Sequence, residues 1–138
     1  MNSDKHLKLT VGNNDQRITR CGKFLRKFKL DELPQLINVL KGEMSFVGPR
    51  PEVQKYVAMY NENQMQVLTV KPGITDYASI KFRNENELLA AAPEPEEYYI
   101  REVMPQKLAL NLDYINNQSF ILDIKLIFKT IVLIFVGR

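Results

Sequence analysis

The strongest constraint on the fold is a short amphipathic segment that begins about thirty residues into the chain. Leu30, Leu33, Leu36, Ile37 and Leu40 recur at three- and four-residue spacing. This spacing places the five side chains on one face of an α-helix. The segment is therefore predicted to be an amphipathic helix.

Capping residues mark both ends of this predicted helix. Asp31 is a good N-cap, because its carboxylate can accept a hydrogen bond from a free backbone N–H of the first turn. Pro34 falls inside that turn, where its missing N–H costs nothing, and Gly42 is placed to end the helix. Ordinary capping also explains the neighbouring acids Asp31 and Glu32, so the pair alone assigns no function.

Positive charge is concentrated just before the two acids. Residues 1–30 hold eight Lys or Arg and two Asp, a net charge of +6, against +3 for the whole chain. A helix N-terminus attracts anions, and so do basic side chains beside it. Two carboxylates in such a field predict a phosphate site with its own nucleophile or metal ligand. The basic end could also face acidic lipid headgroups. It has few aromatics and no RNA-binding signature, so we expect no nucleic-acid partner.

Composition limits the chemistry that the chain can perform. Its 138 residues, 45% hydrophobic and 25% charged, predict one ordered domain spanning residues 1–138. A single cysteine, Cys21, excludes an internal disulfide and fits a reducing compartment. A single histidine, His6, argues against a histidine-based metal site or a Ser-His pair. Catalysis is therefore expected to use carboxylates, Lys, Arg or Tyr.

An arginine between two prolines follows the central helix. Pro49 and Pro51 flank Arg50, and proline fixes φ and restricts the residue before it. Arg50 is therefore expected on a stiff backbone, which suits bidentate recognition of a phosphate or a carboxylate. The alternative is a loop with an incidental surface arginine.

The remaining segments predict a mostly helical α+β fold with a few short strands. We expect strands over residues 7–11 and 77–83, a helix from Pro51 to about residue 68 and a tight turn over residues 71–75. The Glu-rich stretch 85–102 predicts a solvated loop and then the acidic first turn of a helix that reaches about Ile115, kinked at Pro105. The predicted core stripe of that helix consists of Ile100, Met104, Leu108, Leu112 and Ile115.

The last segment, residues 119–136, is strongly apolar but carries Asp123, Lys125 and Lys129. A membrane-spanning helix needs about 20 mostly apolar residues, so this segment is short and too charged to span. It predicts either a buried core helix or an amphipathic helix lying in the headgroup plane of a membrane.

Taken together, these motifs resemble a known family, the bacterial sugar transferases that are monotopic phosphoglycosyl transferases. The resemblance rests on the order and spacing of residues 17–26, 30–36, 38–51, 71–75 and 119–123. It implies transfer of a sugar-1-phosphate from a UDP-sugar to a polyprenol (undecaprenyl) phosphate. The step would occur at the cytoplasmic face of the bacterial inner membrane and begin exopolysaccharide, O-antigen or capsule assembly.

The same resemblance implies roles for individual residues. Asp31 would attack the phosphate next to the sugar and form an aspartyl-phosphosugar intermediate, and Glu32 would hold Mg²⁺. Arg26, Arg50 and Arg83 would contact phosphates, although each could instead be a surface charge. Asp123 matches a recurring family aspartate. A structural ion pair and a supporting catalytic role are both open for Asp123.

Departures from the family pattern leave a second function open. Family members carry an N-terminal hydrophobic hairpin as a membrane anchor, and nothing here matches it, so we expect a catalytic part that is truncated at its N-terminus. Asp76, Ser79 and Asn111 differ from the usual residues and are expected to alter sugar specificity or weaken activity. The alternative function is a catalytically inactive membrane-surface interaction module.

Overall fold

The computed structural model describes Thr19 and residues 33–136. This part of the chain is a mostly helical α+β structure with short strands, as predicted. Its elements follow in chain order: α2 (Gln35–Leu40), β1 (Ser45–Val47), α3 (Gln54–Val57), the 3₁₀ helix η3 (Gln64–Thr69), β2 (Gly73–Thr75), α4 (Tyr77–Lys81), α5 (Glu85–Ala91), α6 (Pro95–Tyr98), the π-helical turn η4 (Tyr99–Val103), α7 (Met104–Asn117) and α8 (Phe120–Val136).

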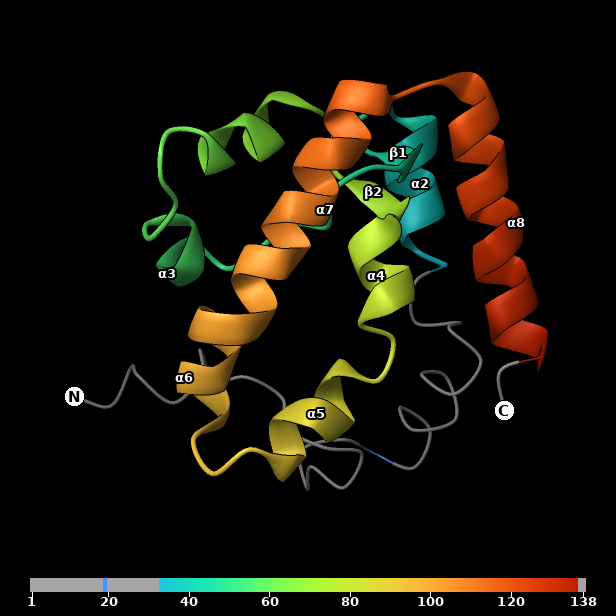
Figure 1. Cartoon of the computed structure of the whole chain (residues 1–138). Helices are drawn as coiled ribbons and strands as arrows, with labels where there is room; N and C mark the ends of the chain where they lie inside the picture. The colour runs from blue at the N-terminus through green and yellow to red at the C-terminus, as the bar shows by residue number, and fades with distance from the viewer. Residues whose placement is uncertain (1–18, 20–32, 137–138) are drawn as a thin grey trace.

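Helix α7 runs through the middle of the described structure, and α8 lies along one edge (Figure 1). The small sheet of β1 and β2 lies between them, while α3 lies on the opposite side of α7. Two buried clusters meet along α7. Its Met104 and Leu108 belong to the first cluster and its Tyr114 to the second. A single helix therefore ties both parts of the core together.

The predicted apolar stripe of α7 is confirmed as core. Met104 and Leu108 are buried, with 5% and 2% of their surface exposed. Ile100, Leu112 and Ile115 are partly buried and pack against the first cluster. Because these positions repeat at three- and four-residue spacing, periodicity alone was sufficient to find them.

The two strands bring distant sequence motifs into direct backbone contact. β1 and β2 pair in parallel, with Ser45 opposite Gly73 and Val47 opposite Thr75. Gly48 N–H donates to the Thr75 carbonyl at 3.0 Å, and Gly73 N–H donates to the Pro49 carbonyl at 3.1 Å. The tight turn predicted over residues 71–75 is therefore wrong in part, since three of these residues form β2. These hydrogen bonds hold the loop that carries Arg50 against β2.

Two further element predictions need correction. Residues 77–81 form α4 instead of a strand, because the carboxylate of Asp76 caps a helix by accepting the Ser79 N–H at 2.6 Å. The long helix predicted from Pro51 to residue 68 is broken into α3 and η3. Asn61 and Gln64 exchange side-chain to backbone hydrogen bonds of 2.9 and 3.0 Å there, an arrangement like a capping box that starts a new helix.

The Glu-rich stretch is also more helical than predicted. Residues 85–91 form α5 where a solvated loop was expected. The helical segment that follows begins at Pro95, as α6. The irregularity expected at Pro105 takes the form of the π-helical turn η4, which ends immediately before α7. The strand predicted over residues 7–11 lies outside the described residues.

The amphipathic segment of residues 30–40 contains α2, which starts at Gln35 with Pro34 at its N-cap. The predicted start at Asp31, with Pro34 inside the first turn, is therefore wrong for this helix. Proline lacks the N–H that helix-interior positions need, so it is best accommodated at the very start. Asp31 itself lies outside the described residues. Gly42 ends the helix as predicted, with φ of +76°. Gly42 N–H and Glu43 N–H donate to the carbonyls of Val39 and Asn38, both at 2.9 Å, which is a Schellman motif.

Helix α8 follows its prediction closely and shows two different faces. Leu126 is 3% exposed and packs in the second core cluster. The other face carries large apolar side chains that are at least half exposed: Phe120, Ile121, Ile124, Phe128, Phe135 and Val136. No helix among the described residues is long and apolar enough to cross a membrane. The arrangement is that expected of a helix with one core face and one face available to another apolar surface.

Candidate active site

A pocket of about 530 Å³ opens beside the loop that carries Arg50. Its walls come from this loop, from α4 and the Arg83 that follows it, and from η4 and α7. Three cationic and three carboxylate side chains line it: Arg50, Arg83, Lys107, Glu52, Asp76 and Glu85. Such a mixture of charge can hold an anionic ligand and also orient its polar groups.

The fold brings together Arg50 and Arg83, two arginines that the sequence analysis assigned to phosphate contacts. Arg50 lies between two prolines on the loop whose backbone is hydrogen-bonded to β2. Arg83 directly follows Phe82, the C-cap residue of α4. Both residues line the same pocket, and planar guanidinium groups match the geometry of a phosphate or diphosphate.

A hydrogen-bonded network that includes the aromatic residue Tyr99 supports one wall of the pocket. Lys107 Nζ lies 3.0 Å from Glu85 Oε2 and 5.2 Å from the centre of the Tyr99 ring. The Tyr99 hydroxyl donates to the Glu52 carboxylate. Burial raises the pKa of Tyr99 well above its usual range, and the hydrogen bond to Glu52 adds to this rise. Glu52 is two residues from Arg50, in the loop between β1 and α3 (residues 48–53), which we call the arginine loop. The network therefore ties the arginine loop to α7.

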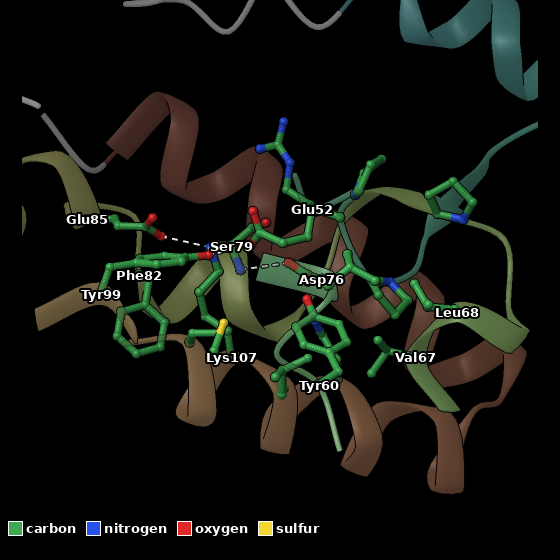
Figure 2. Close-up of a pocket in the computed structure, with 18 of the residues that line it drawn as sticks. Glu52, Tyr60, Val67, Leu68, Asp76, Ser79, Phe82, Glu85, Tyr99 and Lys107 are labelled. Carbon is green, nitrogen blue, oxygen red and sulfur yellow. Dashed lines mark hydrogen bonds and ion pairs between the residues drawn. The ribbon is translucent and has the colours of Figure 1, made fainter. Parts of the chain in front are cut away.

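Aromatic and aliphatic side chains form the apolar part of the pocket. Figure 2 shows Tyr60, Phe82 and Tyr99 around it, with Val67 and Leu68 at one end. Burial, together with the negative charge of Glu52, raises the pKa of Tyr60 to about 12. Rings on such a wall exclude water and can contact the flat face of a base or a sugar.

Asp76 contributes a buried carboxylate that the sequence analysis did not assign to the site. It is 1% exposed and lines the pocket beside Ser79, whose N–H it accepts (Figure 2). The sequence did contain a signal for this position, because Asp is among the residues favoured at a helix N-cap. Asp76, Ser79 and Asn111, the three departures from the family pattern, all line this one pocket.

The other predicted site residues are placed differently. Arg26, Asp31 and Glu32 lie outside the described residues, so their roles stay predictions. Asp123 does not line the pocket. Its Oδ1 instead accepts a hydrogen bond of 2.6 Å from the hydroxyl of Tyr114, which is completely buried. The contact links α7 to α8, and burial with this hydrogen bond raises the pKa of Tyr114 above its usual range.

The described residues contain no group of three or more His, Cys, Asp or Glu side chains that could hold a metal ion. The predicted magnesium ligand, Glu32, is not among them. The prediction of Mg²⁺ therefore depends on a part of the chain beyond the described structure.

Comparison with known proteins agrees with the motifs. The family model "Bacterial sugar transferase" matches residues 1–137. The chain is 38% identical over 131 residues to "Uncharacterized sugar transferase EpsL" of Bacillus subtilis (strain 168), covering 95% of this chain and 57% of that protein. It is 41% identical over 129 residues to the UDP-glucose:undecaprenyl-phosphate glucose-1-phosphate transferase of Escherichia coli (strain K12), covering 91% of this chain and 25% of that enzyme.

A third relative acts, by its name, on a different sugar. It is the UDP-N-acetylgalactosamine-undecaprenyl-phosphate N-acetylgalactosaminephosphotransferase of Aeromonas hydrophila, 36% identical over 139 residues, covering 99% of this chain and 30% of that enzyme. The chain thus spans between a quarter and about three fifths of the length of these relatives. Because the family model covers nearly the whole chain, the chain belongs to the bacterial sugar transferase family.

Proposed function

We propose that the chain performs phosphoglycosyl transfer, moving a sugar-1-phosphate from a UDP-sugar to undecaprenyl phosphate. The observation that carries the proposal is the convergence of Arg50 and Arg83 on one pocket of about 530 Å³. These arginines come from separate segments of the chain, and together they match the charge of a diphosphate. The names of the relatives supply the donor and acceptor classes. Glycan assembly, including exopolysaccharide, O-antigen or capsule, is the proposed use of the product.

The proposed chemistry uses two displacements at one phosphorus atom. An ionised Asp31 oxygen attacks the phosphorus next to the sugar, and the bond to the nucleoside monophosphate breaks. An oxygen of the polyprenol phosphate then attacks the same phosphorus and displaces Asp31. Repulsion between the carboxylate and the phosphates must be cancelled, which is the role proposed for Arg26, Arg50 and Arg83. Glu32 would hold Mg²⁺, which supplies further positive charge when bound.

A membrane surface is the proposed location, specifically the cytoplasmic face of the inner membrane, where a polyprenol acceptor is anchored. The exposed side of α8 carries Phe120, Phe128 and Phe135, each at least two-thirds exposed. Lys125 and Lys129 are also exposed on this helix. Apolar side chains bordered by lysines suit the boundary between acyl chains and anionic headgroups.

The first test is the intact mass of the chain after incubation with Mg²⁺ and a panel of UDP-sugars, without lipid acceptor. A gain of one phosphosugar is expected, because the intermediate cannot be discharged. Asp31→Asn should abolish the gain while the fold survives, since Asn has nearly the same size and keeps a hydrogen-bonding oxygen but cannot act as a carboxylate nucleophile. Asp113→Asn, at an exposed position of α7, is the matched control and should retain the adduct.

Two results of this experiment would decide against the mechanism. A normal phosphosugar adduct on Asp31→Asn would exclude Asp31 as the nucleophile. Adduct formation that survives removal of Mg²⁺ by EDTA would exclude the proposed metal requirement.

The second candidate function is a catalytically inactive membrane-surface module. The exposed apolar face of α8 favours it, because membrane binding needs no chemistry. Absence of any phosphosugar adduct, together with salt-sensitive binding to anionic vesicles, would support this function over the transferase.

A further inference from the structure

An unsatisfied amide in the wall of the pocket points to a specific contact with the ligand. Asn111, on α7, is 7% exposed and lines the pocket. Its Oδ1 is buried and has no hydrogen-bond partner among the described residues. Gln35 holds the other such atom in the described part of the chain, but it does not line the pocket. Buried polar atoms without partners are rare and cost about 1–3 kcal/mol.

Several polar neighbours of Asn111 in the pocket already have partners of their own. Lys107 is held by Glu85, and Asp76 accepts the Ser79 N–H. The Tyr99 hydroxyl donates to Glu52. If Lys107 or Tyr99 donated a hydrogen bond to Asn111 Oδ1, one of these existing contacts would be weakened. A ligand in the pocket can satisfy it without that loss.

The chemistry of an amide restricts what that ligand group can be. An asparagine side chain is neutral and carries both an acceptor and a donor, and turning the amide over exchanges their positions. It therefore pairs best with a neutral group that also donates and accepts, such as a sugar hydroxyl, an acetamido group or the edge of uracil. A phosphate, which is acceptor-rich and charged, is better matched by the arginines.

We infer that Asn111 is a specificity-determining residue that hydrogen-bonds a neutral donor–acceptor edge of the UDP-sugar, while Arg50 and Arg83 contact its phosphates. The inference rests on the proposed function and deepens it. By this inference, one part of the pocket binds the charged phosphates and another part binds the neutral polar groups of the donor. Discrimination is expected to be sharp, because a donor that lacks the matching group would leave the buried amide unpaired.

The test measures binding of three probes by calorimetry: inorganic pyrophosphate, UDP and the UDP-sugar that forms the adduct. The full-length chain is used with Asp31→Asn to prevent turnover, with and without Asn111→Leu. Leucine has a similar size but no polar atoms, so the free protein should keep or gain thermal stability. Asn116→Leu, at an exposed position of α7, is the matched control, and Asn111→Ala replaces Asn111→Leu if the latter does not fold.

The expected result is a loss of about tenfold or more in affinity for the UDP-sugar, with pyrophosphate binding unchanged. A loss already present with UDP would place the contacted edge on uracil, and one confined to the UDP-sugar would place it on the sugar. Unchanged affinity for every probe, or an equal loss with pyrophosphate, would overturn the inference. Failure of the parent chain to bind UDP or any UDP-sugar would instead overturn the proposed function, and the inference with it.

Discussion

At the residue scale, two glycines allow the arginine loop to pack against β2. Gly48 and Gly73 lie where the backbones of two motifs touch. A Cβ on Gly73 would lie 2.1 Å from Gly48 N, and a Cβ on Gly48 would lie 2.6 Å from the Lys71 carbonyl oxygen. Both clashes are with backbone, which cannot rotate away as a side chain can. Small size is therefore required at these two positions because the strands must approach closely.

Replacing Gly73 by alanine should lower the free energy of unfolding by about 3 kcal/mol or more, because the added methyl group forces the two backbones apart. Gly42→Ala is the matched control. A Cβ on Gly42 would meet nothing closer than Lys71 Nζ at 3.8 Å, so it should cost only about 1–2 kcal/mol for the left-handed backbone. Urea denaturation of the three proteins tests the difference. Equal losses for both variants would show that β1 and β2 can separate without penalty.

Arg50 is expected to act through the geometry of its guanidinium group as well as through its charge. Arg50→Lys keeps the charge but loses the planar pair of donors, so the rate of phosphosugar adduct formation should fall about tenfold or more. Arg101→Lys is the control, since the Arg101 side chain is 73% exposed and pairs with Glu97. The adduct rate is measured by intact mass against time. A normal rate in Arg50→Lys would reduce Arg50 to a general source of positive charge.

At the scale of elements, helices with a clear apolar periodicity were predictable and most other short elements were not. The stripe of α7 and the extent of α8 follow from apolar periodicity over several turns. Residues 77–81 fit a strand pattern as well as a helix pattern, because five residues are too few to separate the two periods. The decisive signal was the cap at Asp76. β1 and β2 have three residues each, and they exist because their backbones pair across the fold.

The candidate site divides in the same way. Arg50 could be predicted from the two prolines that flank it, and Arg83 from the resemblance to the family. Glu52, Tyr99 and Lys107 could not, because no spacing in the sequence links them. They meet only when the arginine loop docks against η4 and α7. Tertiary packing therefore determined the part of the pocket that sequence analysis missed.

Helix α8 is predicted to bind membranes through its exposed face. Phe128→Ser combined with Ile124→Ser should weaken binding to anionic vesicles about tenfold or more, because each removes an apolar side chain that lipid would bury. Leu88→Ser, at a 45% exposed position on α5, is the control for loss of exposed apolar surface elsewhere. Vesicle co-sedimentation at two salt concentrations provides the measurement. Binding that is unaffected by the double substitution would move the lipid contact away from α8.

At the scale of the whole molecule, buried tyrosines connect the parts of the fold. Tyr56 and Tyr99 lie in the first core cluster, with ring centres 5.0 Å apart. Tyr114 lies in the second and donates to Asp123 on α8. Burial is the largest cause of a raised pKa at each of these tyrosines. The folded state therefore depends on their hydroxyl groups keeping their protons.

This dependence predicts cooperative unfolding in alkali. Burial raises the pKa of Tyr56 to about 12, with added contributions from Glu96 and Glu52, and the pKa of Tyr60 also rises to about 12. An unfolded tyrosine ionises near pH 10, so this stabilisation is complete below pH 10 and is lost as pH rises towards 12. Each such tyrosine should lower the free energy of unfolding by at most about 1.4 kcal/mol per pH unit in this range.

Urea midpoints at pH 8, 10, 11 and 12 should therefore fall steeply above pH 10. The tyrosinate absorbance of the buried tyrosines should appear together with loss of helical circular dichroism. Tyr60→Phe should make the fall less steep, because one ionisable group is removed from the folded core. Tyrosinate absorbance near pH 10 beyond what the exposed Tyr98 can supply, without unfolding, would contradict the prediction. It would mean that water reaches the rings in the folded state, so that the clusters joined by α7 open independently.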